Sequence, residues 1–352
     1  MAKIDYLKQV KDNINRGIQG LNTGLPTGFT RLSNHISNLQ QRRYITVGGA
    51  TGTGKTAMVD SGYLFAPYEY LQSVETDEEL EVIYYSLEIP IEEKLAKFVC
   101  LRLWEQHRIY LDSMELYSEG PKKLRKEVIP LLDQCFEYFE TMQNKVLKFR
   151  GSMSPDYMYR DLMTYAEKRG TVTKNEEGII IQYIPHNPRL ITQIIVDHSN
   201  LITPNKQDAS KKQAIDRFSQ MAVFFRNTFG FSFIVVSQFN RGIEGMDRKA
   251  NDAQEPQLSD FKETGSTQED ANIVLGLFNP FRYGIENHRG YPVDKLKRRY
   301  RSVHVLKNRG GMDGLVVGMH FMGETGKFKE LPTPEDLEAN PHLLAKILEY
   351  GK

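Results

Sequence analysis

Short apolar runs alternate with longer amphipathic stretches from residue 44 onward. Several of these runs are apolar at nearly every position, which is typical of strands that are buried on both faces. Buried strands separated by helical stretches indicate an α/β fold, with a mainly parallel central sheet flanked by helices. The predicted strands are Tyr44–Gly48, Val82–Ser86, Val146–Phe149, Ile194–Asp197, Phe233–Ser237, Ile273–Phe278 and Val303–Lys307, followed by a hairpin arm at Leu315–Phe321.

A short helix with one apolar stripe is predicted for residues 3–19, ending at Gly20. The stripe packs either on the helix's own domain or on a neighbouring subunit. Residues 22–28 (NTGLPTG) are typical of an irregular tether, so we expect residues 1–20 to be a linker helix that docks on a neighbour, and residues 21–330 to form the main domain. The apolar residues of the stripe are Ile4, Leu7, Val10, Ile14 and Ile18.

Three stretches of the main domain interrupt the alternation and are interpreted as insertions. Residues 66–81 are acidic, residues 104–144 form a long helical excursion, and residues 171–188 contain an extra hairpin. A C-terminal tail follows at residues 331–352, with a short helix near its end. The tail either binds a partner or packs on the chain's own surface as a strap, and we favour the strap.

The composition excludes several classes of protein. With 40% hydrophobic and 11% aromatic residues among 352, the chain can bury a core, so it is neither disordered nor fibrous. No run approaches the roughly 18 apolar residues of a membrane span, and the N-terminus lacks the apolar stretch of a signal peptide. A soluble, cytoplasmic protein is therefore expected. Cys100 and Cys135 have no CxxC or CxxxH companion, so the sequence supports neither a disulfide framework nor a zinc site.

The net charge is +1, from 46 Lys and Arg against 45 Asp and Glu. This total indicates nothing for or against a nucleic-acid partner. Its distribution is uneven, because residues 66–93 contain nine acids and no Lys or Arg, whereas residues 294–309 contain seven Lys or Arg and one acid. The basic run at 295–301 is either a solvated surface or a DNA contact. A near-neutral total is thus compatible with a positively charged path for phosphates.

A phosphate-binding loop is predicted directly after the first strand. Residues 49–56 fit the pattern GxxxxGK[ST], and helix-forming residues follow. Glycines let consecutive backbone N–H groups turn toward phosphates at a helix N-terminus, where the helix dipole favours anions. Lys55 would reach the β- and γ-phosphates and the Thr56 hydroxyl would ligate Mg²⁺, so the predicted ligand is a nucleoside triphosphate. The loop residues are Gly49, Ala50, Thr51, Gly52, Thr53, Gly54, Lys55 and Thr56.

Hydrolysis at such a loop also needs a second acid for the metal and a base for water. Asp197 ends an apolar strand, which would place its carboxylate at the carboxyl edge of the sheet beside the loop. Glu88 follows the strand Val82–Ser86 and would lie at the same edge. The alternatives are a turn aspartate for the first residue and a surface glutamate for the second.

Further short motifs follow one another along the chain. They are residues 23–29 (TGLPTGF), the phosphate loop, residues 86–88 (SLE), 195–197 (IVD), 237–241 (SQFNR), 258–260 (LSD), 263–266 (ETGS) and 269–271 (EDA). In this order they resemble the ATPase domain of the DnaB-type replicative helicases, over roughly residues 20 to 330. The resemblance implies a RecA-like P-loop NTPase core, ATP and Mg²⁺ as ligands, and a homohexameric ring.

The resemblance also implies roles for the matched residues. Glu88 would be the general base for water, Asp197 would hold Mg²⁺ together with the loop threonine, and Gln238 would sense the γ-phosphate. Lys307 and Arg309 match the family's Lys-x-Arg, which is inserted into the next subunit's ATP site with the arginine as a finger. A charged hairpin turn is the alternative for these two residues.

By the same resemblance, the loop from residue 240 to 267 faces a central channel. Lys262, Glu263 and Gly265 match positions that grip the phosphates of single-stranded DNA, and Arg241 is taken as a further DNA contact. Contact with the DNA backbone suits a translocating motor, because phosphate geometry repeats at every nucleotide. The family usually has Arg where Lys262 stands, and Lys lacks the bidentate fork of Arg.

The implied function is an ATP-hydrolysing replicative helicase that moves 5′ to 3′ on single-stranded DNA at a replication fork. The family's helicases carry a helical N-terminal domain that contacts primase, whereas about 20 residues precede these motifs. Contact with primase, a helicase loader or single-strand-binding protein is therefore open, and the short form suits a phage protein. The alternative is a RecA-like DNA-binding ATPase, a recombination or loading factor that does not unwind. A third possibility, an assembly platform with a structural nucleotide, would not need a base and a finger.

Overall fold

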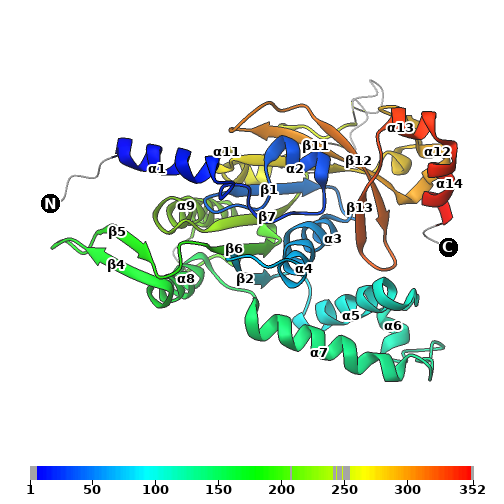
Figure 1. The fold of residues 1–352 in the computed structure, drawn as a ribbon, viewed down its shortest axis with the longest axis horizontal. Coiled ribbons are helices and arrows are strands. Elements are labelled where there is room, and N and C mark those ends of the chain that lie inside the picture. The colour runs from blue at the N-terminus through cyan, green and yellow to red at the C-terminus, as the bar shows by residue number, and fades with distance from the viewer. Residues whose placement is uncertain (1–5, 207, 241–242, 244–247, 249–253, 350–352) are drawn as a thin grey trace.

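The computed structural model describes residues 6–206, 208–240, 243, 248 and 254–349. One nine-stranded sheet runs through the molecule, with helices on both of its faces (Figure 1). Its strand order is β13-β12-β11-β8-β1-β7-β6-β2-β3. The strands are β1 (Tyr44–Gly49), β2 (Glu79–Ser86), β3 (Leu147–Arg150), β6 (Leu190–Asp197), β7 (Ser232–Gln238), β8 (Ile273–Phe278), β11 (Tyr300–Asn308), β12 (Val316–Met322) and β13 (Lys327–Glu330).

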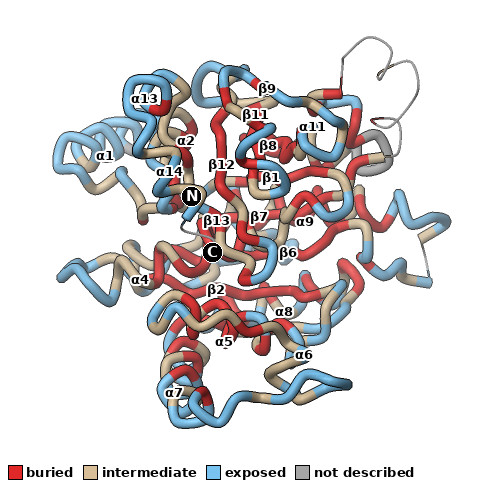
Figure 2. Tube along the Cα trace, turned by 90° about the vertical axis from the view of Figure 1, so that its right-hand side faces the viewer, coloured by how far each residue is buried: buried red, intermediate tan, exposed pale blue. Residues whose placement is uncertain are grey.

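The six strands from β8 to β3 are parallel to one another, and β11, β12 and β13 extend the sheet as antiparallel strands. Strands β1 and β8 are buried at every position. Figure 2 shows the strands as the buried interior of the molecule. This burial on both faces explains the continuous apolar runs of the sequence, and it confirms the predicted α/β class with a mainly parallel sheet.

Helices cover the two faces of the sheet and bury a separate apolar cluster on each. On one face lie α3 (Lys55–Asp60), η1 (Ser61–Phe65), α5 (Ile91–His107) and α7 (Ile129–Lys145), and on the other lie α8 (Pro155–Arg169) and α9 (Lys211–Phe229). The remaining elements are α1 (Tyr6–Ile18), α2 (Thr30–Ile36), α4 (Ala66–Ser73), α6 (Ser113–Leu116), β4 (Gly170–Lys174), β5 (Ile180–Pro185), η2 (Ser199–Leu201), η4 (Leu258–Thr264), α11 (Gly265–Asp270), η5 (Pro280–Tyr283), β9 (Asn287–His288), β10 (Tyr291–Pro292), α12 (Val293–Leu296), η6 (Lys297–Arg299), α13 (Pro334–Ala339) and α14 (Pro341–Glu349).

The structure differs from the sequence expectation at residues 66–81. Residues 66–73 form α4, which continues the helix begun by α3 and η1, and β2 begins at Glu79. Only residues 74–78 connect the two elements, so the acidic stretch belongs to the core fold. Its acids misled the interpretation because most of them cluster in that connection and at the start of β2. The excursion at 104–144 contains α6 and most of α7, and the stretch at 171–188 contains the β4–β5 hairpin.

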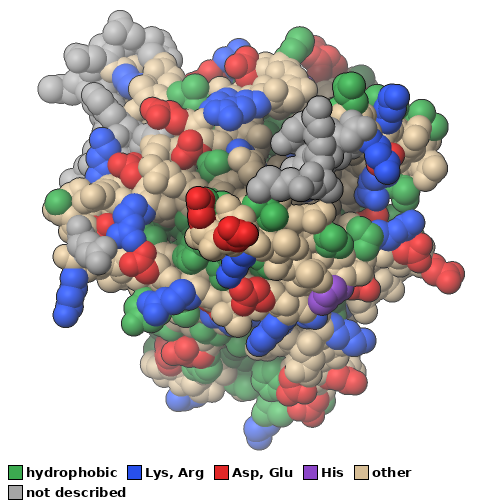
Figure 3. Space-filling model, turned by 90° about the vertical axis from the view of Figure 1, so that its left-hand side faces the viewer, with side chains coloured by type: hydrophobic (Ala, Val, Ile, Leu, Met, Phe, Trp, Pro, Cys, Tyr) green, Lys and Arg blue, Asp and Glu red, His purple; other side chains and the backbone are tan. Residues whose placement is uncertain are grey.

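The two ends of the described chain lie at opposite ends of the molecule in the view of Figure 1. Ile4 of the predicted apolar stripe lies outside the described residues. The other residues of the stripe are exposed on α1, Leu7 at 73% and Ile18 at 79%, so they do not pack on their own domain. Figure 3 views the end that carries α1, where basic and acidic side chains are interspersed and apolar ones lie among them. The tail helices α13 and α14 pack on Tyr291, Val293 and Tyr300. The tail is therefore a strap on its own surface.

None of the helices in the described ranges is both long and apolar enough to pass through a bilayer.

Candidate nucleotide-binding site

The predicted phosphate loop connects β1, in the middle of the sheet, to the N-terminus of α3. Gly52 and Gly54 have φ angles of +78° and +93°, in the left-handed region that favours glycine. A Cβ atom at Gly54 would lie 2.8 Å from the ring of Phe328 and 3.0 Å from that of Phe321. The turn therefore requires glycine at position 54 for both its backbone angle and its lack of a side chain.

Two side chains of the loop take positions suited to a nucleotide and its metal. Lys55 Nζ donates a hydrogen bond to the carbonyl oxygen of Ala50 over 3.1 Å. Burial lowers the pKa of Lys55 to about 8, although the carboxylates of Asp197 and Glu88 oppose this shift. The Thr56 hydroxyl donates to Asp197 Oδ1 over 3.0 Å. The structure thus brings together the two residues predicted to hold a metal.

A hydroxyl and a carboxylate oxygen fit Mg²⁺, which usually binds through one or two protein groups together with substrate phosphates. Asp197 is buried, at the carboxyl end of β6. Its second oxygen, Oδ2, accepts hydrogen bonds from Tyr84 (3.2 Å) and Lys94 (3.3 Å). The first oxygen is therefore the one that faces the loop beside Thr56.

Glu88 lies just beyond β2, at the same edge of the sheet as Asp197. Its backbone N–H lies 3.3 Å from the carbonyl oxygen of Asp197, and its side chain is 52% exposed. Glu88 Oε2 lies 3.6 Å from His198 Nε2. Burial lowers the pKa of His198, which favours the neutral imidazole. The carboxylate is thus accessible to water and close to the loop, as a general base must be.

Gln238 connects the end of β7 to the phosphate loop. Its side-chain Nε2 donates to Thr51 Oγ1 over 2.8 Å, and its backbone N–H donates to Asn200 Oδ1 over 3.0 Å. A side chain held in this way can respond to a group bound in the loop. Asn200, which was not predicted from the sequence, fixes the backbone from which Gln238 extends.

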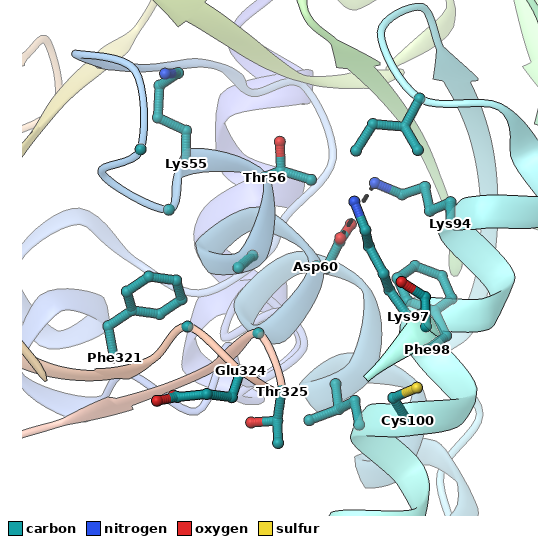
Figure 4. A pocket seen from close by; sticks show the side chains of 18 of the residues that line it. Lys55, Thr56, Asp60, Lys94, Lys97, Phe98, Cys100, Phe321, Glu324 and Thr325 are labelled. Atoms are coloured by element: carbon teal, nitrogen blue, oxygen red, sulfur yellow. Dashed lines mark ion pairs between the residues drawn. The ribbon is translucent and has the colours of Figure 1, made fainter. Parts of the chain in front are cut away.

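A cavity of about 520 Å³ opens over the loop. Figure 4 shows Phe321 and Glu324, from the hairpin arm, on one side of it, with Lys94 and Phe98 of α5 on the other. Glu88 and Gln238 also line it. Its volume lies within the range of about 300–1,000 Å³ that is usual for small-molecule and cofactor sites.

Two arginines bind backbone carbonyl groups of the loop, and neither contact was predicted from the sequence. Arg301 Nε donates to the carbonyl oxygen of Thr53 over 2.9 Å, and Arg282 Nη1 donates to that of Thr51 over 3.0 Å. In a trans peptide the C=O and the following N–H point in opposite directions. Holding these carbonyls therefore turns the N–H groups of Gly52 and Gly54 toward the cavity. Within the basic run at 295–301, Arg301 is thus an internal support for the loop.

Lys307 and Arg309 lie near the amino ends of the parallel strands, whereas the phosphate loop of the same chain lies at their carboxyl ends. Asn308 of β11 pairs with Ile273, the first residue of β8, so this end of β11 is level with the start of the parallel strands. Lys307 Nζ donates to the carbonyl oxygens of Gln268 (2.8 Å) and Glu269 (2.7 Å), and Arg309 Nη2 donates to that of Glu269 over 2.6 Å.

The predicted DNA contacts fall where the structure describes little. Arg241 lies outside the described residues. For Lys262, Glu263 and Gly265 only the backbone is described, in η4 and at the start of α11.

A second group of potential metal ligands consists of Glu255, His288 and His304, whose nearest ligand atoms lie within 4.8 Å of one another. Arg289 binds both carboxylate oxygens of Glu255, through Nε (2.9 Å) and Nη2 (2.6 Å), and these bonds lower the pKa of Glu255 to about 2. His288 bridges Glu255 and the Tyr300 hydroxyl. Hydrogen bonds and an ion pair thus account for this group.

Residues 185–330 match the family described as "DnaB-like helicase C terminal domain". This match covers less than half of the chain. It includes Asp197, Gln238, Lys307 and Arg309, and the phosphate loop lies upstream of the matched range.

Beyond that range, the chain is also similar to curated proteins. It is 23% identical over 343 residues to "Replicative DNA helicase DnaB" of Helicobacter pylori (strain J99), covering 90% of this chain and 61% of that protein. It is 24% identical over 339 residues to "Replicative DNA helicase DnaC" of Bacillus subtilis (strain 168), covering 93% of this chain and 61% of the relative. The chain therefore spans about three fifths of the length of these relatives.

Solved structures share the fold of this chain. One of them, described as an ATPase domain, has a TM-score of 0.70 at 19% identity, covering 94% of this chain and 100% of that one. A DnaB-like replicative helicase, described with its interactions with primase, has a TM-score of 0.68 at 20% identity, covering 93% of this chain and 68% of that one. These similarities confirm the predicted RecA-like fold.

Proposed function

We propose that this chain is the motor domain of an ATP-dependent replicative DNA helicase. One observation carries the proposal: Lys55 and Thr56, Asp197, and Glu88 come from three separate segments and converge at the carboxyl ends of the parallel strands, in a chain that is similar to the DnaB-like helicase C-terminal domain. A nucleotide that served only to stabilise an assembly would need the first three groups, but it would not need a carboxylate accessible to water.

The residues divide the chemistry of ATP hydrolysis among them. The loop N–H groups and Lys55 would bind the phosphates, and Thr56 and Asp197 would hold Mg²⁺, which when bound would supply positive charge to the transferred phosphoryl group. Glu88 accepts a proton from the attacking water. Gln238, through its contact with Thr51, joins the phosphate site to the segment that follows β7.

The proposed assembly is a homohexameric ring around single-stranded DNA. The exposed stripe of α1 would dock on a neighbouring subunit, because a contiguous apolar surface is a common interaction site. Arg309 lies at the sheet edge opposite its own loop, which suits a finger that enters a neighbour's site, with Lys307 as its cationic partner. The channel contacts would come from Arg241, Lys262, Glu263 and Gly265.

A forked DNA duplex with ATP and Mg²⁺ tests the proposal directly. The wild-type protein should separate the strands, and Glu88→Gln should still bind ATP and assemble but lose hydrolysis. Glu92→Gln is the matched control, since Glu92 is an exposed acid four residues along the same segment. Wild-type hydrolysis stimulated by single-stranded DNA, with no opening of the fork, would favour the RecA-like ATPase that binds DNA without unwinding it. Unchanged turnover in Glu88→Gln would remove that residue as the base.

A further inference from the structure

A fully buried lysine lies next to the predicted metal site. Lys94, on α5, is 1% exposed. Its Nζ lies 3.2 Å from Asp60 Oδ2 and 3.3 Å from Asp197 Oδ2, and 4.2 Å from the centre of the Tyr84 ring. Figure 4 shows Lys94 extending from α5 toward Asp60, below the loop residues.

Stability alone gives no reason for charges at this position. A buried ion pair often stabilises a fold no more than apolar residues of similar volume, because both charges lose their hydration. Asp60 shows this cost, since burial raises its pKa to about 6 even with Lys94 beside it. We therefore explain the Lys94–Asp60 pair by its effect on Asp197, which also forms an ion pair with Lys94.

The two carboxylate oxygens of Asp197 have different partners. Oδ1 accepts the hydrogen bond from Thr56, whereas Oδ2 is held by Lys94 and lies 3.2 Å from the Tyr84 hydroxyl. Asp60 holds Lys94 from the other side, and Asp60 follows Thr56 by four residues, so both lie on one face of the helix that begins at the loop. The chain of contacts runs from Thr56 through Asp197 and Lys94 back to this helix.

We propose that Lys94 is a positioning residue for the magnesium site. Held by Asp60, it fixes Oδ2 of Asp197 and thereby presents Oδ1, together with the Thr56 hydroxyl, to the metal. This inference rests on the proposed function, because it assumes that Thr56 and Asp197 bind Mg²⁺ with a nucleotide. Residues that orient a metal ligand typically change metal affinity by about 10- to 100-fold when they are replaced.

The test separates position from charge. Lys94→Met/Asp60→Leu removes one positive and one negative charge, so the net charge beside the metal is unchanged, and the apolar pair fills a similar volume. Binding of a fluorescent ADP analogue is measured with EDTA and then over a Mg²⁺ titration. We expect the variant to bind the analogue as wild type does in EDTA, and to need at least about tenfold more Mg²⁺ for the metal-dependent change.

Lys148→Met is the matched control. Lys148 also forms an ion pair, with Glu81 (3.1 Å), and lies 5.2 Å from the ring centre of Tyr165, near the opposite end of β2. It should therefore keep the wild-type Mg²⁺ midpoint. Lys94→Gln/Asp60→Asn is a second charge-balanced variant with nearly native shapes, and its midpoint should rise by a smaller factor because the Gln amide can still donate to Asp197.

The outcomes distinguish this inference from the proposed function. A wild-type protein whose nucleotide binding does not respond to Mg²⁺ would overturn both. A wild-type protein that responds, together with either double variant that folds by circular dichroism and keeps the wild-type midpoint, would overturn the role of Lys94 alone. An equal rise in Lys148→Met would also overturn it, because the effect would then follow from losing any such ion pair.

Discussion

Replacing Arg301 by methionine should weaken both the fold and nucleotide binding. Arg301 is 5% exposed, and burial lowers its pKa to about 10. Its guanidinium donates to the carbonyl oxygens of Thr53 (2.9 Å), Arg298 (2.8 Å) and Tyr300 (2.7 Å), and it lies 5.0 Å from the centre of the Phe321 ring. Methionine keeps an unbranched stem of similar length but removes every donor.

The size of the effect follows from these contacts. Three carbonyl groups lose a donor, and a buried carbonyl without a partner costs about 1–3 kcal/mol. Losing the contact with the aromatic ring adds about 1 kcal/mol. The guanidinium no longer has to be dehydrated on folding, which offsets part of this loss. We therefore expect the free energy of unfolding to fall by about 2–3 kcal/mol.

Urea unfolding followed by circular dichroism measures this loss, and titration with a fluorescent ADP analogue measures binding by the folded protein. We expect ADP to bind about tenfold more weakly, equivalent to about 1.4 kcal/mol, because the N–H group of Gly54 is no longer held toward the cavity. Arg298→Met is the control, since Arg298 is 76% exposed and pairs with Glu324 (3.1 Å). An exposed pair of this kind contributes at most about 1 kcal/mol.

Two results would refute the reasoning. If Arg301→Met and Arg298→Met lost the same free energy of unfolding, the carbonyl groups around Arg301 would have other partners. The burial of Arg301 would then not explain the loss of stability. If Arg301→Met lost stability but bound ADP with unchanged affinity, the arginine would support the fold without orienting the loop.

Three further predictions concern the loop and its proposed partner in trans. Gly54→Ala should lose about 1–3 kcal/mol more stability than Gly52→Ala in chemical unfolding, because only a methyl group at position 54 meets aromatic rings; equal losses would contradict this. Bound phosphate should raise the lowered pKa of Lys55, so ADP binding at pH 8.5 should take up about 0.7 proton per site. Calorimetry in two buffers of different ionisation enthalpy measures this uptake, and identical heats would count against it. Mixing Arg309→Ala with Lys55→Ala subunits should restore part of the ATPase activity that each lacks, and no recovery at any ratio would exclude a finger acting in trans.

The sequence predicted those parts of the fold and site that are encoded locally. The continuous apolar runs indicated buried parallel strands, and the spacing within residues 49–56 identified the loop. Asp197 and Glu88 followed from their places at strand ends, because parallel strands bring their carboxyl ends to one edge. Each of these inferences needed only a few consecutive residues.

The supporting residues could not be found in this way, because their partners are distant in the sequence. Arg301 contacts the carbonyl of Thr53 across 248 positions, and Lys94 reaches Asp197 across 103. Lys94 follows Glu92 and Glu93, so in sequence it is typical of an exposed helix face. Lys94 points inward only because α5 packs against the sheet, and there its ammonium group forms ion pairs with Asp60 and Asp197.

Strand β11 joins two places that the proposed ring would use in different subunits. Arg301, near its start, holds the phosphate loop of its own chain, and Arg309 follows its end at the opposite edge of the sheet. Eight residues of extended chain span about 26 Å, and β11 is hydrogen-bonded on both sides, to β8 and β12. If Arg309 enters a neighbour's site, β11 supports the phosphate loop of one subunit through Arg301 and carries the arginine that enters the site of the next subunit. A shift of the loop on binding or releasing nucleotide would then be transmitted along this strand to the arginine in the neighbouring subunit's site.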